Sequence, residues 1–412
     1  MVDALFGRRS RRFLLGAEIP DGPLAHRSAH EPLALGETER DLILAAVGGN
    51  TGWHHSITRH ERYAPHLSNY PGSASGRTFP SAAGFHTAEV FFTDDDGVHL
   101  LETRDAPPAV DRDDEGRLPL RELLRANAAR VRTLSSERLW IPPREPYMEG
   151  HNTWVANRPG SLLVFPVADV AQHAIANLAF FAQNGYAIYD DVHRRPIPGL
   201  ERFRSLVDVD DPLPLTFLDQ YSLTEATAEV STACYAGALV QQAIGLGGWT
   251  FNGIDRLTVL GASGDPEVPG LGFRYDEDER WALPNPTGLP GVFEALTPPH
   301  VPDMRAAVDR FAERKFGPGG PFHPDTPGPW KDSRRVRGSA QGHDEAFREL
   351  LALQAQYVYD TFGKWPATVP SVWILMYLQS HHLDLEYYDR HFAPGAYLPT
   401  HAEHLRRWDG ID

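Results

Sequence analysis

An arginine-rich segment near the N-terminus has the composition of a phosphate-binding site. Residues 8–12 read Arg-Arg-Ser-Arg-Arg, which places four guanidinium groups and one hydroxyl within five residues. Guanidinium groups meet a phosphate dianion with forked, charge-assisted hydrogen bonds, and a hydroxyl adds a further donor. Arg8, Ser10 and Arg12 occupy alternate positions, with Arg9 between the first two. The alternative is a solvated basic tip on a flexible chain end.

A turn of small residues before a predicted strand is a second candidate. It comprises Pro80, Ser81, Ala82, Ala83, Gly84, Phe85 and His86. Small residues let backbone amides approach the edge of a flat ligand, and Ser81 offers a hydroxyl. Taken alone, the segment also fits an ordinary turn.

A glycine-rich segment after a predicted helix over 223–244 is the third candidate. Gly245 is expected to end that helix, and Trp249, Asn252 and Gly253 follow. The glycines follow a helix instead of opening one after a strand, so they form no dinucleotide fingerprint. No Gly-Lys-Ser/Thr is present either, which excludes a P-loop. The alternative is a helix cap and a loop.

In order, spacing and local context, the three segments together resemble the nitroreductase-like FMN flavoproteins, and within them the branch of the azoline oxidases. The resemblance implies an α+β fold, with a mostly antiparallel sheet flanked by helices and FMN bound at a homodimer interface. It also implies that Arg8, Ser10 and Arg12 hold the flavin phosphate and ribityl end. Residues 80–83 would lie along the isoalloxazine ring, and Asn252 and Gly253 would lie near flavin N5.

The resemblance therefore assigns a set of cofactor-binding residues. These are Arg8, Arg9, Ser10, Arg12, Pro80, Ser81, Ala82, Ala83, Asn252 and Gly253. Phe85 and Trp249 are candidates for the substrate side, and no catalytic side chain is assigned. The family's late basic contact to the phosphate has five candidates, Arg274, Lys315, Arg334, Arg335 and Arg337. A Lys/Tyr pair of the kind expected in azoline oxidases is missing, so azoline oxidation is not predicted.

Histidines near the C-terminus form a separate group that could bind a metal. On a helix, His382 and Glu386 would share one face, as would His401 and His404. Imidazole and carboxylate are common ligands of zinc and iron. The spacing matches no known metal motif, and histidines at helix ends more often cap or hydrogen-bond the backbone. We therefore predict no metal site.

Composition restricts the class of protein. The 412 residues include 39 Lys and Arg against 55 Asp and Glu, a net charge of −16. This acidic balance argues against nucleic acid or an anionic membrane as the main partner. One cysteine, Cys234, excludes an internal disulfide framework. Residues 10–14 look like a twin-arginine export signal, but polar residues and Pro20 follow, so we expect a cytoplasmic protein.

Periodicity predicts the main elements. We expect helices over 38–47, 118–133, 168–184 and 223–244, strands over 88–92 and 161–167, and a hairpin from 88–92 into 98–101. Thirteen of the 35 prolines fall in 261–330. We therefore expect an FMN-binding domain over 1–260 with an insertion at about 105–160, a connecting segment over 261–340, and a helical C-terminal extension over 341–412 that holds the apolar run 372–379.

These observations predict an FMN-dependent oxidoreductase that works as a homodimer. A donor such as NAD(P)H would reduce the flavin, and a small nitro, quinone or enone-like substrate would take the electrons. Three alternatives stay open. The first is an FMN-dependent oxidase of a biosynthetic intermediate that uses O₂. The others are a metal-dependent hydrolase built on the C-terminal histidines and a flavin-binding protein without catalysis.

Overall fold

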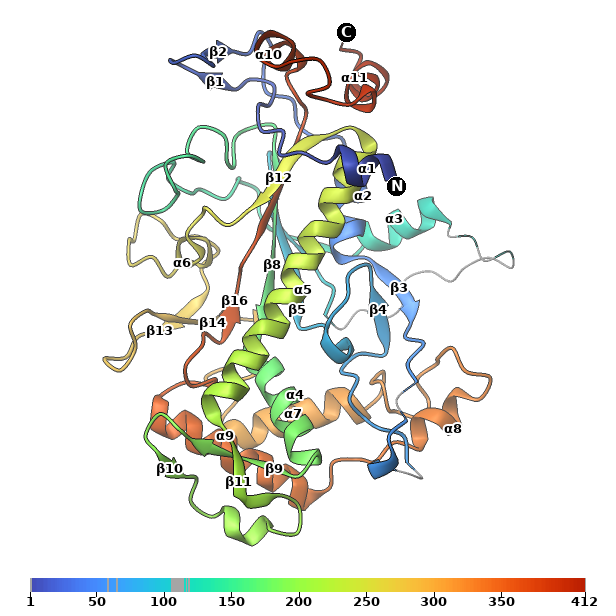
Figure 1. The fold of residues 1–412 in the computed structure, drawn as a ribbon, viewed down its shortest axis with the longest axis vertical. Coiled ribbons are helices and arrows are strands. Elements are labelled where there is room, and N and C mark those ends of the chain that lie inside the picture. Colours follow the sequence, from blue (N-terminus) through green and yellow to red (C-terminus); the bar gives the residue numbers. More distant parts are fainter. Residues whose placement is uncertain are drawn as a thin grey trace.

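A twisted antiparallel sheet forms the centre of the molecule and helices surround it (Figure 1). The computed structural model describes residues 2–57, 59–63, 66–104, 115, 117 and 119–411. The expected fold class, a mixed architecture of helices and a mostly antiparallel sheet, is confirmed. Among the described residues, no helix combines the length and the apolar character that a membrane crossing requires.

The main sheet has the strand order β12-β17-β8-β5-β6-β7, and each pair of neighbours is antiparallel. The strands are β5 (Ala88–Asp94), β6 (Gly97–Leu101), β7 (Val131–Ser135), β8 (Leu162–Asp169), β12 (Gly247–Phe251), β16 (Val372–Trp373) and β17 (Tyr377–His381). Strand β16 pairs with the end of β8 beyond β17. The predicted strands over 88–92 and 161–167 and the hairpin into 98–101 are confirmed.

Helix α5 (Leu215–Ile244) runs along the sheet for most of the length of the molecule (Figure 1). It begins earlier than the predicted start at 223, because Ser222 does not cap the helix. The Ser222 hydroxyl donates instead to the carbonyl of Leu218, one turn back within the helix. The predicted end is confirmed, since Gly245 caps the helix with φ 92°.

The other helices are α1 (Val2–Gly7), α2 (Glu37–Gly48), α3 (Leu120–Ala128), α4 (Val170–Gln183), α6 (Arg256–Leu260), α7 (Met304–Phe316), α8 (Ser333–Gly338), α9 (Glu345–Phe362), α10 (Leu385–His391) and α11 (Pro399–His404). Short 3₁₀ turns are η1 (Glu61–Tyr63), η2 (Ala82–Gly84) and η3 (Leu200–Phe203), and η4 (Leu405–Asp409) is a π-helical turn. The predicted helices over 38–47 and 168–184 are confirmed as α2 and α4.

Small sheets complete the structure. They pair β1 (Glu18–Ile19) with β2 (His26–Arg27), β3 (Asn50–Trp53) with β4 (Ser75–Arg77), β9 (Tyr186–Asp190) with β10 (Arg195–Pro196) and β11 (Asp208–Pro214), and β14 (Asn285–Leu289) with β13 (Arg274–Asp276) and β15 (Phe293–Glu294).

Two element predictions are wrong. The helix expected over 118–133 ends at Ala128, and its last residues belong to β7. The run 372–379 is not part of a helical extension, since it forms β16 and the start of β17, which lies between β12 and β8. A strand covered on both faces is apolar at successive positions, which sequence periodicity alone does not separate from a buried helix. Within the predicted insertion at 105–160, residues 105–114, 116 and 118 lie outside the described part of the chain.

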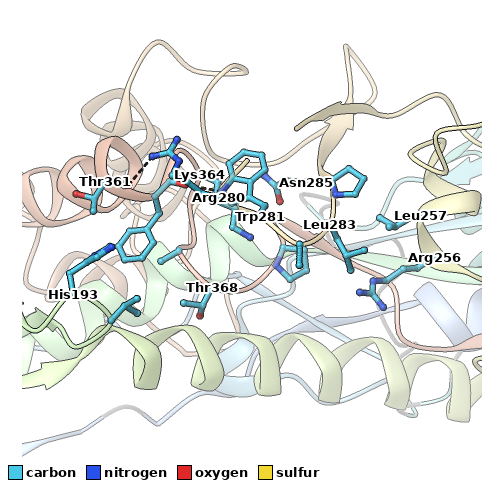
Figure 2. Close-up of a pocket in the computed structure, with 16 residues that line it drawn as sticks. His193, Arg256, Leu257, Arg280, Trp281, Leu283, Asn285, Thr361, Lys364 and Thr368 are labelled. Carbon is cyan, nitrogen blue, oxygen red and sulfur yellow. Dashed lines mark hydrogen bonds between the residues drawn. The ribbon is translucent and has the colours of Figure 1, made fainter. Parts of the chain in front are cut away.

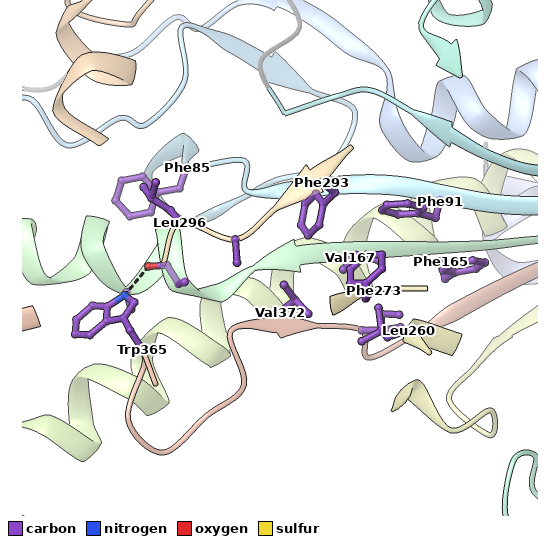
Figure 3. Packing of buried hydrophobic residues seen from close by; sticks show 14 of the residues in the cluster. Phe85, Phe91, Phe165, Val167, Leu260, Phe273, Phe293, Leu296, Trp365 and Val372 are labelled. Carbon is purple, nitrogen blue, oxygen red and sulfur yellow. Dashed lines mark hydrogen bonds between the residues drawn. The ribbon is translucent and has the colours of Figure 1, made fainter. Parts of the chain in front are cut away.

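The largest hydrophobic cluster joins residues that are far apart in the sequence (Figure 3). Phe91 and Phe165 from the main sheet stack against each other, and Phe273 and Phe293 meet Phe91 edge-on. Trp365, from the loop after α9, donates its indole N–H to the carbonyl of Ala171 at 2.9 Å. All three segments of the predicted domain division therefore contribute to one core.

Candidate functional site

The arginine-rich segment runs beside the outer edge of β12. Its backbone pairs with that strand, because the amide of Gly248 donates to the carbonyl of Arg11 at 2.8 Å. The Arg11 side chain is buried and donates to Gln242 Oε1 at 2.7 Å and to the carbonyl of Ala396 at 2.8 Å. Arg11 thus anchors the segment to α5 and to the C-terminal chain.

Three of the predicted phosphate-binding residues line one pocket of about 460 Å³. Its walls combine basic and aromatic side chains and comprise Arg9, Ser10, Arg11, Arg12, Phe13, Trp154, Tyr387, Tyr388, Phe392, Gly395 and Ala396. We call it the arginine pocket. The fourth predicted residue, Arg8, is exposed and does not line it. The volume lies within the range of small-ligand sites.

Arg12 is held at the wall of this pocket by aromatic and carbonyl contacts. Its guanidinium carbon lies 4.8 Å from the centre of the Trp249 ring, and the group donates to His151 O at 2.7 Å and to Asn152 Oδ1 at 2.8 Å. Burial lowers the pKa of Arg12 from its ordinary value. The Nε atom is buried and makes no hydrogen bond in the described structure. One donor of a fixed cation is therefore left for a ligand.

Gly253 joins the third segment to the first. A Cβ atom at this position would lie 2.0 Å from Nδ2 of Asn152, the residue that accepts from Arg12. The carbonyl of Gly253 accepts from the amide of Glu149 at 3.0 Å, which fixes the two segments of chain against each other. The Asn152 Nδ2 atom is buried and also lacks a hydrogen-bond partner among the described residues. The neighbouring Asn252 side chain is exposed.

Asn152 is a residue that the sequence did not reveal. It lies in the charged, proline-rich region taken as an insertion, with no motif around it. Only the fold brings it between Arg12 and Gly253. Trp249, expected on the substrate side, is buried beneath the Arg12 guanidinium and stacks on Phe251 at 4.6 Å.

The second segment lies in a different place. Phe85 and His86 line a pocket of about 560 Å³ that shares no residue with the arginine pocket. Within the turn, Ala83 has φ 45°, a left-handed conformation that is costly for a residue with a side chain. The Ser81 hydroxyl is buried and makes no hydrogen bond in the described structure. Strain and an unused hydroxyl at one turn are features of a binding site.

This second pocket carries its own basic groups, among them Arg104, Arg314 and Lys315. Burial lowers the pKa of Lys315 to about 7, and its ammonium donates to the carbonyl of Asn69. Burial also lowers the pKa of His86 to about 2, so its ring is neutral at pH 7. Among the late basic candidates, only Lys315 lines either of these two pockets, while the side chains of Arg274, Arg334 and Arg335 are exposed.

A third pocket, of about 480 Å³, lies at the C-terminal end of α9 (Figure 2). Arg280 and Trp281 line it and donate to the carbonyls of Thr361 and Phe362, both at 2.8 Å. No predicted site residue lines this pocket, and it shares no lining residue with the other two. It is therefore separate from the segments that the sequence singled out.

Two of the C-terminal histidines come together, and the other candidate residues lie apart from them. His382 and His404 meet each other beside Glu39, a residue of α2. His401 contacts Gln242 at 3.2 Å instead, and Glu386 is exposed. The expected pairing of His382 with Glu386 is wrong, because His382 follows a strand while Glu386 lies in α10. His401 and His404 lie on one helix, α11, as expected.

Comparison with known proteins gives a distant likeness to solved structures. No protein-family model matches the chain, and no curated protein matches it. Among solved structures, it is similar to a protein from Ralstonia eutropha described as a "putative nitroreductase", with a TM-score of 0.26 and 13% sequence identity. The match covers 62% of this chain and 70% of that one.

Proposed function

We propose that the protein is an FMN-dependent oxidoreductase whose flavin site includes the arginine pocket. The observation that carries the proposal is the junction of Arg12, Asn152 and Gly253. It unites two of the three segments predicted from the sequence, and it leaves two buried donor groups without a partner in the described structure. Buried donors of this kind call for a ligand or an ordered water.

The residues present fit the chemistry of FMN. Arg9, Ser10 and Arg12 supply two cations and a hydroxyl for a phosphate, and Trp154, Tyr387 and Tyr388 supply flat surfaces for a ring. Bound FMN would supply hydride transfer, and the protein would supply position and charge. The Arg12 cation, fixed against Trp249, would stabilise negative charge at the ring edge of the reduced cofactor.

A second copy of the chain would complete the site. The 80–84 turn does not line the arginine pocket, and Phe85 and His86, which follow it, line the other pocket. Large apolar side chains are exposed on α1 and α5, as expected for a surface that pairs with another subunit; they include Phe6, Phe217, Tyr221 and Tyr235. We propose a homodimer in which the turn of one subunit faces the arginine pocket of the other.

The spectrum of the purified protein tests the cofactor. Flavin bands in the visible, at about one FMN per chain after desalting, are expected. Arg12→Ala is expected to weaken FMN binding about 10- to 100-fold, the usual effect of losing charge-assisted hydrogen bonds. Arg27→Ala is the matched control, since Arg27 is exposed on β2 and lines no part of the pocket. A protein that retains no added FMN contradicts the proposal.

A second measurement tests which compound gives electrons to the flavin and which compound takes them. We propose NAD(P)H as donor and a small organic acceptor, since the protein offers a wide, partly aromatic pocket and no assigned acid or base. Anaerobic titration with NADH and with NADPH is expected to bleach the flavin bands. Reduction only by another organic substrate, with reoxidation by O₂, would contradict this direction and favour an oxidase.

A further inference from the structure

Four potential metal ligands from distant parts of the chain converge beside the N-terminal end of α2. Glu39 lies in the first turn of α2, and His382 follows β17. His404 ends α11, and Asp409 ends the turn η4. With one ligand atom chosen for each residue, all four atoms lie within 4.8 Å of one another. We call this group the α2 cluster.

The individual contacts are close to the separations that a bound ion needs. His382 Nε2 lies 3.6 Å from Glu39 Oε2, and His382 Nδ1 lies 3.4 Å from Asp409 Oδ2. His404 Nε2 contacts the other oxygen of Glu39. Zinc bonds of about 2.0 Å in a tetrahedron put ligand atoms roughly 3.3 Å apart. An ion binds one nitrogen of each ring, so only one of the two His382 contacts would persist. With one atom chosen per residue, side-chain rotations would have to close separations of up to 4.8 Å to about 3.3 Å.

The cluster is buried, and its polar atoms are incompletely satisfied. The side chains of His382 and His404 are each 1% exposed, Glu39 is 2% exposed and Asp409 is 16% exposed. Both ring nitrogens of His382, Nδ1 of His404 and Oδ2 of Asp409 make no hydrogen bond of standard geometry in the described structure. A buried ring nitrogen without a hydrogen bond is costly, and it is suited to a cation.

The charges of the cluster also point to a cation. The charged groups that act most strongly on Glu39 and on Asp409 are the histidines and the other carboxylate of the same cluster. Two neutral imidazoles and two carboxylates would together neutralise a divalent ion. Mixed nitrogen and oxygen ligands favour zinc or iron over magnesium or calcium, which prefer oxygen alone.

We propose that Glu39, His382, His404 and Asp409 bind one divalent transition-metal ion, with Zn²⁺ the best match. The ion would be structural, because four protein ligands fill a tetrahedral site and leave no open position. It would tie the C-terminal chain to α2. The same stretch of chain, through Tyr388 and Ala396, forms a wall of the arginine pocket. The proposal does not depend on the identity of the cofactor.

Metal analysis of the tag-free, full-length protein tests the site. We expect about one zinc ion per chain, or one iron or manganese ion in its place. After removal of the metal with a chelator, added Zn²⁺ is expected to raise the melting temperature. His382→Gln and Asp409→Asn are expected to lose stoichiometric zinc. His343→Gln is the matched control. His343 is also a buried histidine whose ring nitrogens make no hydrogen bond among the described residues. Its ring contacts the aromatic side chains of Phe311, Phe316 and Phe347 and no residue of the cluster.

The wild-type protein provides a test that does not depend on folding of a variant. Co²⁺ added to the metal-free protein is expected to give the visible absorption of a tetrahedral site, and Zn²⁺ is expected to displace it. A protein that is purified without metal, and that shows neither cobalt absorption nor a change in melting temperature with Zn²⁺, overturns the proposal. Zinc retained equally by His382→Gln and Asp409→Asn would place the metal elsewhere and would also overturn it.

Discussion

Buried polar atoms without partners mark the places where single residues matter most. Arg12 Nε, Asn152 Nδ2 and Ser81 Oγ belong to this class within the described chain. Leaving such a group unpaired costs about 1–3 kcal/mol, so a ligand that pairs with it binds more tightly and also stabilises the fold. All three atoms lie at segments singled out by their sequence or in contact with one.

Gly253→Ala tests the junction between two of those segments. The new Cβ would approach Asn152 Nδ2 to 2.0 Å and push aside the amide that accepts from Arg12. We expect FMN affinity to fall about tenfold, with a loss of stability of about 1–3 kcal/mol. Titration with FMN and urea unfolding measure the two effects. Gly342→Ala is the control, since no atom of the described residues lies within 4 Å of its Cβ position. An unchanged affinity would show that Asn152 does not position Arg12.

Asp219→Asn tests the cost of a buried acid on α5. Burial raises the pKa of Asp219 to about 6, although the carboxylate accepts from the amide and the hydroxyl of Thr368, both at 2.7 Å. The folded protein therefore binds a proton that the unfolded chain has already lost between about pH 4 and 6, so this group costs stability as the pH rises through that window. The cost reaches roughly 3 kcal/mol above about pH 7.

Because asparagine stays neutral, the variant is expected to gain stability relative to the wild type as the pH rises from about 4 to about 8. The asparagine oxygen can still accept both hydrogen bonds from Thr368. Urea unfolding of both proteins at several pH values measures the difference. Parallel curves for the two proteins would contradict the raised pKa.

Among the elements, α5 packs so closely against the sheet and α2 that only a very small residue fits at position 237 of the helix. A Cβ at Gly237 would lie 2.5 Å from both Leu378 Cδ2 in β17 and Val47 Cγ2 in α2. Glycine weakens a helix by about 1 kcal/mol relative to alanine. The fold tolerates that cost because this contact joins the helix to a central strand.

Gly237→Ala is expected to lower the free energy of unfolding by about 1 kcal/mol. The overpacking cost of about 1–3 kcal/mol outweighs the gain in helix propensity. Gly237→Val adds two more methyl groups in the same space and is expected to cost more than alanine does. Chemical unfolding of the two variants beside Gly342→Ala measures the series. A stabilised alanine variant would mean that β17 and α2 move apart freely.

At the scale of the whole molecule, the predicted flavin residues divide into two groups on one chain. Arg9, Ser10 and Arg12 line the arginine pocket, whereas Pro80, Ser81, Ala82 and Ala83 line neither pocket. Phe85, the substrate-side candidate that follows them, lines the other pocket. A symmetric dimer would bring each group of one subunit to the opposite group of the other, and would form two sites. In the proposed dimer, this division would follow from the assembly of the two subunits.

Mixed dimers test that arrangement. We expect Arg12→Ala and Ser81→Glu to lose FMN as separate homodimers. A heterodimer of the two variants has one site with both defects and one site with none, so about one FMN per dimer is expected to return. Size-exclusion chromatography with light scattering and the flavin spectrum measure the assembly and its content. If all three segments served one subunit, every site in the mixture would carry a defect and no FMN would return.

The local elements and the residues capable of chemistry can be recognised from the order of residues along the chain. Hydrophobic periodicity predicted α2, α4, β5, β6 and β8, because each forms from neighbouring residues whose pattern records one buried face. Residue type also singled out Arg12, and the family resemblance pointed to Gly253, before the position of Asn152 between them was known. Those features are local, so the chain order is enough to reveal them.

Which residues lie together depends on the packing of the elements. The apolar run 372–379 forms part of a central sheet because β8 and β12 cover its edges, and a continuous apolar pattern does not distinguish that environment from a buried helix. Asn152 reaches Arg12, and Glu39 reaches His382 and His404, although long stretches of chain separate them. Such contacts depend on how elements pack, and no short sequence pattern encodes a partner that distant.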